Sequence, residues 1–170
     1  TLVSVASYLF ERAVAIAKKE GRTLAEVTAP YKPVSCSNLS SSRALRDVTE
    51  EYGGEYEAAA VGEVNVTTKM RQTGALIGGE GNGGVIYPAS HYGRDAMVGV
   101  ALFLSNLAHK KMKVSELKRT YPEYHIAKNK IELSDKGLID RILEEMKKEY
   151  AAEEINDIDG VKISFESKRQ

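Results

Sequence analysis

Apolar residues recur at helical spacing from the start of the chain. The stripe consists of Leu2, Val5, Ala6, Leu9, Phe10, Ala13, Val14 and Ala17. Spacings of three and four residues place these side chains on one face of an α-helix, which would pack on a core. Gly21 follows the stripe and suits the left-handed residue that often ends a helix. The pattern therefore predicts a helix over residues 2–20.

Short apolar runs then alternate with segments of helical character. The runs VSCSN, YEAAAV, ALIGG and GVIYP, at residues 34–38, 56–61, 75–79 and 84–88, predict strands. Residues 40–54 and 62–74 separate them and predict helices, the first with its serines as caps and the second ending at Gly74. Alternating strands and helices followed by a hairpin indicate an α/β fold: a mixed sheet with helices on both faces.

The segment GRDAMVGVALFLSNLAHKK, residues 93–111, is apolar nearly all round from Met97 to Leu107. Such a pattern predicts a helix that is buried on every side. Asp95 precedes the apolar run, and its carboxylate favours the N-terminus of that helix over contact with a substrate.

The character of the chain changes after Lys113. Residues 114–133 are polar and predict a connector, residues 134–150 predict an amphipathic helix, and Asp159-Gly160 predicts a hairpin turn. One helix and a two-stranded hairpin bury little apolar surface. We therefore expect two parts, 1–112 as a complete α/β domain and 113–170 as a hinge with the first part of an incomplete α+β domain.

The charge balance narrows the classes of partner. The chain has 24 basic and 24 acidic residues, and the two signs are interleaved, which argues against nucleic acid as a partner. No apolar run is long enough for a membrane span, so we expect no membrane partner. The lone Cys36 indicates an inert core residue in a reducing, cytoplasmic setting. Three scattered histidines do not predict a metal site.

The loop GGEGNGG, residues 78–84, contains five glycines around Glu80 and Asn82. It fits the string of a dinucleotide fingerprint, but a strand follows it where that fingerprint requires a helix. A plain hairpin turn needs only about two such residues. Two interpretations stay open: a flexible hairpin tip, and a loop that lets a ligand approach its backbone, with a carboxylate that accepts hydrogen bonds from hydroxyl groups.

The stretch ALIGGEGNGGVIYPASHYGRDA resembles the sugar-binding loop of the α-D-phosphohexomutase superfamily, which includes phosphoglucosamine mutase, phosphomannomutase and phosphoglucomutase. VSCSNLSSSRALRD and VGEVNV resemble two further segments of the same domain, the third of four. The resemblance implies that residues 1–112 are this sugar-binding domain. Residues 113–170 would then be the hinge and a truncated N-terminal part of the C-terminal domain.

The resemblance also implies roles for individual residues. Glu80 and Asn82 would bind the sugar hydroxyls, on a loop whose backbone is formed by Gly79, Gly81 and Gly83. Four further residues would face the substrate: Ser40, Glu63, His91 and Arg94. The chain departs from the family pattern at Gly84, where many relatives carry His, and at Ser40 and Glu63, where some carry a basic residue or His.

Members of this superfamily are isomerases that move a phosphoryl group between the 1- and 6-positions of a hexose. They use a phosphoserine and a Mg²⁺ ion that other domains hold. Neither motif occurs in these 170 residues. The resemblance thus implies a fragment of such an enzyme, inactive alone, with a phosphosugar and the other domains of the parent chain as partners. A stand-alone carbohydrate-binding or scaffolding domain without catalysis is the alternative.

Overall fold

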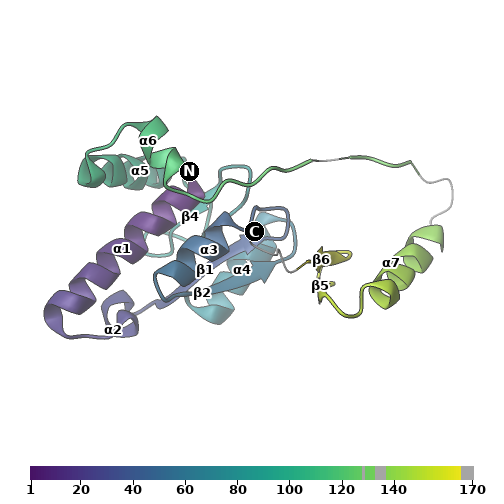
Figure 1. Cartoon of the computed structure of the whole chain (residues 1–170). Helices are drawn as coiled ribbons and strands as arrows, with labels where there is room; N and C mark the ends of the chain where they lie inside the picture. The colour runs from purple at the N-terminus through teal and green to yellow at the C-terminus, as the bar shows by residue number, and fades with distance from the viewer. Residues whose placement is uncertain (128, 133–136, 166–170) are drawn as a thin grey trace. The chain divides into compact units, whose positions relative to one another are not determined.

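A computed structural model describes residues 1–127, 129–132 and 137–165. By its internal contacts the chain divides into two compact units, Thr1–His125 and Ile126–Gln170. The first unit contains the glycine loop and the sheet that carries it (Figure 1).

The sheet of the first unit has four strands in the order β2-β1-β3-β4. Strand β1 (Lys32–Asn38) pairs in parallel with β2 (Glu55–Ala59) on one side and with β3 (Ala75–Gly79) on the other. The short β4 (Val85–Ile86) runs antiparallel to β3. The predicted mixed sheet and its closing hairpin are confirmed. The carboxyl ends of the three parallel strands consequently share one edge.

Helices cover both faces of this sheet, and each face has its own apolar cluster. On one face, Val5 and Phe10 of α1 (Leu2–Glu20) pack with Leu45 of α3 (Ala44–Glu51). On the other, Val66 and Met70 of α4 (Glu63–Thr73) pack with strand residues that include Val34 and Cys36. Strand side chains alternate between two covered faces, which explains why β3 is wholly buried and β1 is buried from Val34 to Asn38. The helices α1, α3 and α4 surround the sheet in Figure 1.

Left-handed glycines end two of these helices where the sequence predicted it. Gly21 follows α1 at φ 64°, and its amide donates to the carbonyl of Ala17. Gly74 follows α4 at φ 72° and donates to Met70. Residues with a Cβ rarely adopt this conformation, so the two glycines fix where the helices end.

Three local expectations differ from the structure. The serines at 40–42 make no side-chain cap on α3, whose N-cap is Arg43. A short α2 (Leu24–Thr28) lies between the first helix and the first strand, where no element was expected, with Thr23 and Glu26 forming a capping box. A further α6 (Val114–Arg119) lies in the expected connector, where Leu117 is buried. Thr-x-x-Glu was therefore a readable signal, since it satisfies two backbone amides at once.

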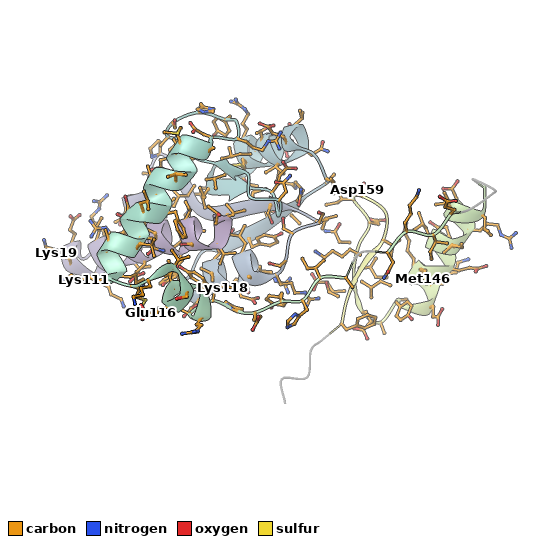
Figure 2. The ribbon with its side chains drawn as sticks, turned by 90° about the horizontal axis from the view of Figure 1, so that it is seen from above. Lys19, Lys111, Glu116, Lys118, Met146 and Asp159 are labelled. Carbon is orange, nitrogen blue, oxygen red and sulfur yellow. The ribbon has the colours of Figure 1, made fainter. Side chains whose placement is uncertain are left out.

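The expectation that residues 93–111 form a fully buried helix is wrong in its burial. Helix α5 (Ala96–Lys110) forms and lies beside α1, as Figure 2 shows near Lys19 and Lys111. However, Met97, Val100 and Leu104 are 78%, 53% and 56% exposed. A helix on the outer layer of a domain buries only the face toward its neighbours. The rest of its apolar surface is left to solvent.

The second unit contains α7 (Gly137–Glu149) and a hairpin of β5 (Glu154–Asn156) and β6 (Lys162–Ser164). The strands are antiparallel with Ile155 opposite Ile163, and Gly160 in the turn has φ 82°. The predicted helix and hairpin are confirmed. Among the residues that the structure describes, no helix is long and apolar enough to cross a membrane.

Candidate functional site

Three polar side chains of interest come from the carboxyl ends of neighbouring parallel strands. Asn38 is the last residue of β1, Glu80 directly follows β3, and Glu63 begins the helix after β2. In open α/β sheets ligands bind at this edge, because side chains from several strands converge there. The sheet order therefore assembles the site from segments that lie far apart in the sequence.

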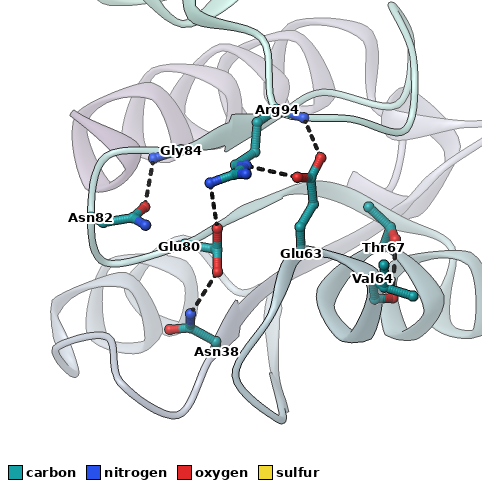
Figure 3. Close-up of polar contacts among 8 residues, drawn as sticks. All are labelled: Asn38, Glu63, Val64, Thr67, Glu80, Asn82, Gly84 and Arg94. Carbon is teal, nitrogen blue, oxygen red and sulfur yellow. Dashed lines mark hydrogen bonds and ion pairs between the residues drawn. The ribbon is translucent and has the colours of Figure 1, made fainter.

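Glu80 is buried, with 6% of its surface exposed, and both of its carboxylate oxygens have partners (Figure 3). The Nδ2 of Asn38 donates to Oε1 at 3.1 Å. The Nη1 of Arg94 lies 3.1 Å from Oε2. A buried carboxylate is costly unless it is hydrogen-bonded and its charge is compensated, and here each oxygen receives one donor. A carboxylate oxygen can accept two hydrogen bonds, and among the described residues one donor to each oxygen of Glu80 is seen.

Arg94 is itself held at two points by Glu63. Its backbone amide donates to Oε1 at 3.0 Å, and its Nε donates to Oε2 at 2.8 Å. These two bonds from Arg94, the backbone one above all, hold the pKa of the Glu63 carboxyl below its ordinary value. Figure 3 shows the resulting row, in which the guanidinium lies between the carboxylates of Glu63 and Glu80.

The glycine loop closes on itself around Glu80. The amide of Glu80 donates to the carbonyl of Gly84, and the amide of Gly83 donates back to the carbonyl of Glu80. Asn82 is exposed, and its Oδ1 accepts from the amide of Gly84 at 3.3 Å. A Cβ on Gly79 would lie 2.0 Å from the Gly84 carbonyl oxygen. Only glycine permits this approach of the two loop ends.

The loop also packs against the turn that follows β1. A Cβ on Gly81 would lie 3.0 Å from the Cα of Ser41 and 3.3 Å from the carbonyl oxygen of Ser40. Ser41 donates its hydroxyl to the Oδ1 of Asn38 at 2.8 Å, which orients the amide that reaches Glu80. Ser40 is exposed, and its backbone is the part that faces the loop.

His91 contacts the start of α5. Its Nε2 lies 3.0 Å from Oδ2 of Asp95, while Oδ1 of Asp95 accepts from the amide of Val98 and so caps the helix as predicted. These two bonds, that of Val98 first, lower the pKa of Asp95. His91 also lies near Gly93 and Glu63 at the border of the site.

The sequence-predicted residues are thus brought together in part. Glu63, Glu80 and Arg94 form one connected cluster with the loop, while His91 pairs with a helix cap. Asn38 and Ser41 belong to the cluster and were missed. The signal that could have found Asn38 is an amide at the carboxyl end of a predicted parallel strand, the edge where sites form.

The arrangement provides a carboxylate that can accept hydrogen bonds from hydroxyl groups. A carboxylate oxygen can accept a second hydrogen bond, and the loop is exposed at residues 81–83, where Gly83 has open space around its Cα. Within residues 1–127, 129–132 and 137–165, no group of three or more His, Cys, Asp or Glu side chains could hold a metal ion.

Comparison with known proteins gives a consistent picture. Residues 11–124 match the family model of phosphoglucomutase/phosphomannomutase, alpha/beta/alpha domain III. A phosphoglucosamine/phosphogalactosamine mutase of Sulfurisphaera tokodaii is 32% identical over 74% of this chain, and a probable phosphoglucosamine mutase of Methanopyrus kandleri is 31% identical over 76%. The chain spans only 28% and 29% of the lengths of these two relatives.

Solved structures agree at the level of the fold. A phosphoglucomutase/phosphomannomutase family protein of Burkholderia thailandensis matches 95% of this chain with a TM-score of 0.64 at 23% identity, and the match covers 32% of that protein. The family model covers most of the first unit, including the glycine loop and every residue of the Glu63–Arg94–Glu80 cluster. The chain belongs to the phosphoglucomutase/phosphomannomutase family and carries its domain III.

Proposed function

We propose that this chain is the sugar-recognising piece of a phosphohexomutase, an isomerase that interconverts hexose 6-phosphates and hexose 1-phosphates. Glucosamine phosphate and mannose phosphate are the favoured substrates. The membership in the family supports the reaction class. The names of the relatives from Sulfurisphaera tokodaii and Methanopyrus kandleri, which are mutases of amino sugars, support a hexosamine phosphate.

One observation carries the proposal: the buried carboxylate of Glu80 is fixed on both oxygens and still has acceptor capacity. Asn38 and Arg94 each supply one donor to it. Two adjacent hydroxyl groups of a pyranose donate in the directions that remain, and bonds to a charged acceptor are stronger than neutral ones. Asn82, exposed at the tip of the same loop, supplies an amide for a further hydroxyl.

The phosphoryl transfer itself is assigned to other domains of the parent protein. Among the residues that the structure describes, no group of side chains fits a Mg²⁺ ion, and we propose that its ligands lie in those other domains. Residues 1–112 would be the third domain, and 113–170 the hinge and the N-terminal part of the C-terminal domain. The single, buried Cys36 is compatible with a cytoplasmic enzyme.

Replacing Glu80 by Gln in the parent enzyme tests the role of the loop. The neutral amide has lost the charge and must turn an NH₂ group toward one donor. We expect kcat/KM to fall about 10- to 150-fold, the equivalent of roughly 1.5–3 kcal/mol for a bond to a charged group. Asn82→Ala should be milder, about fivefold, since a neutral bond is worth about 1 kcal/mol.

The matched control is Glu57→Gln. Glu57 is a β2 carboxylate whose charged partner is Lys69, 3.8 Å away, and β1 lies between its strand and β3, which leads into the loop. It should leave kcat/KM within about twofold, because surface ion pairs contribute little. Unchanged kinetics of Glu80→Gln, with a fold intact by circular dichroism, would mean that the glycine loop is only a turn.

The proposal also requires that the 170-residue chain be inactive as a mutase. Turnover of glucosamine 6-phosphate and mannose 1-phosphate by the purified chain, compared with a heat-treated sample, measures this directly. We expect no difference between the two samples. Turnover above the heat-treated background would place catalytic groups within this chain and contradict the assignment.

A further inference from the structure

Arg94 is tied to the loop by packing as well as by charge. Its Cδ lies 2.6 Å, and its Cγ 3.1 Å, from the position that a Cβ on Gly84 would occupy. The arginine stem therefore runs directly along the loop backbone, in the space that any side chain at position 84 would need. Gly84 and Arg94 are consequently a matched pair: the absence of one side chain makes room for the other.

The direction of the guanidinium is fixed from its far side. Glu63 accepts from both the backbone amide and the Nε of Arg94, at 3.0 and 2.8 Å. An exposed ion pair by itself contributes little, because two long side chains must be ordered to form it. Here the Glu63 carboxylate accepts hydrogen bonds from both the backbone and the side chain of Arg94. A single partner therefore removes much of the conformational freedom of the arginine side chain.

The guanidinium held in this way contacts the carboxylate of Glu80. The Glu80 side chain is 8% exposed, and the Nη1 of Arg94 is the cation against its Oε2. Asn38 holds the other oxygen with a neutral amide. Without Arg94, the buried carboxylate would keep one neutral donor for a full negative charge, which is unfavourable in a poorly solvated position. Turning the carboxylate outward to water would relieve this cost.

We propose that Arg94, anchored by Glu63 and accommodated by Gly84, is the positioning residue that holds Glu80 inward for sugar recognition. Arg94 acts through Glu80: its Nε is directed at Glu63 and its Nη1 at Glu80. Glu63 is thus the support of Arg94 and does not contact the sugar. The inference rests on the proposed function for its ligand, but the positioning itself is a property of the ligand-free chain.

The first experiment is therefore made without ligand. Backbone ¹⁵N NMR of the 170-residue chain would compare the parent sequence with Arg94→Met, Arg94→Lys and the control Arg22→Met. Arg22 pairs with Glu20 on the exposed surface after α1. We expect Arg94→Met to shift the amides of residues 80–84 and raise their fast mobility, Arg94→Lys to restore part of the parental spectrum, and Arg22→Met to leave the loop unchanged.

The second experiment adds glucosamine 6-phosphate as the probe and follows the same amides. We expect Arg94→Met to weaken binding about tenfold or more, and Glu63→Gln to weaken it by a smaller factor. In the Glu80→Gln background, Arg94→Met should cost no further affinity, because a residue that acts only through Glu80 has nothing left to position. A purely structural effect would add to that of Glu80→Gln.

The outcomes separate the two proposals. A loop unaffected by Arg94→Met in the ligand-free spectra overturns the positioning role, whatever the titration shows. Full additivity of Arg94→Met and Glu80→Gln also overturns it. A loop that loosens as expected in a chain that does not bind glucosamine 6-phosphate sustains the positioning role and counts against sugar recognition by this chain alone.

Discussion

At the scale of single residues, burial decides chemistry at Cys36 and Asn106. Burial, with a smaller contribution from Glu57, raises the pKa of the Cys36 thiol to about 12, so the thiolate needed for reactivity is scarce. The Nδ2 of Asn106, a buried residue of α5, lies within 3.0–3.1 Å of the Ser4 carbonyl and hydroxyl on α1 and of the Tyr121 hydroxyl. Cys36 is an unreactive core residue, as its sequence context predicted. Asn106 connects two helices by buried hydrogen bonds that no local sequence pattern indicated.

Acid should loosen the site through Glu63. Its folded-state pKa lies below the ordinary 4.5, chiefly because the Arg94 amide donates to it. A lowered folded pKa contributes stability that is present above the ordinary value and is lost as pH falls through the folded value. Between about pH 6 and about pH 3, the unfolding midpoint should therefore fall more steeply for the parent chain than for Glu63→Gln.

Thermal unfolding followed by circular dichroism at a series of pH values measures this difference. Glu55→Gln, at an exposed carboxylate at the start of β2, controls for the loss of one acidic group. It should follow the parent curve. Identical pH profiles for the parent chain and Glu63→Gln would show that the Glu63–Arg94 pair contributes nothing to stability.

At the scale of elements, the position of α5 in the fold decides which of its apolar residues are buried and which are exposed. One face packs on the domain, where Gly99 is buried and a Cβ there would lie 3.3 Å from Val85. The opposite face carries Met97, Val100 and Leu104 into solvent. Both faces carry apolar residues, and the apolar pattern by itself does not say which of them is buried. Contact with α1 and β4 does.

Substitutions on the two faces of α5 should have opposite consequences. Met97→Ser removes an exposed side chain and should change the free energy of unfolding by no more than about 0.5 kcal/mol. Gly99→Leu forces a side chain against Val85 and should cost about 1–3 kcal/mol or more. Urea denaturation of both variants measures the difference. A large loss for Met97→Ser would mean that this face of α5 is buried in solution.

At the scale of the whole molecule, the two units differ in how much of them is buried. In the first, α1 alone contributes eight buried residues, and apolar clusters lie on both faces of the sheet. In the second, α7 contributes none, and Ile139 and Ile142 are 42% and 39% exposed. Buried apolar surface is the main source of stability, so the units should open at different free energies.

Hydrogen exchange should resolve this difference. We expect the amides of α7 and of the β5–β6 hairpin to exchange before those of α1 and β1, since their backbone hydrogen bonds lack a covering core. Exchange followed by NMR at a constant pH gives the opening free energy of each amide. Equal protection in both units would show that they unfold as one cooperative body.

Local physical chemistry made much of the fold readable from the sequence. Helical spacing gave α1, apolar runs gave β1 and β3, and Gly21 and Gly74 marked helix ends. These signals depend on residues within a few positions of each other, through hydrogen bonds along the helix and the handedness that only glycine tolerates. The glycine loop and its carboxylate Glu80 could also be predicted, because their residues are neighbours in the sequence.

Only the tertiary structure decided what surrounds Glu80. Asn38 reaches it across 42 positions because β1 and β3 are parallel neighbours, and Glu63 meets Arg94 across 31 positions. Such contacts depend on strand order and on the route of the chain between strands, which no local period encodes. The sequence therefore determined that a carboxylate stands on a glycine loop. The order of strands determined which amide and which arginine hold it, because it alone brings those segments to one edge of the sheet.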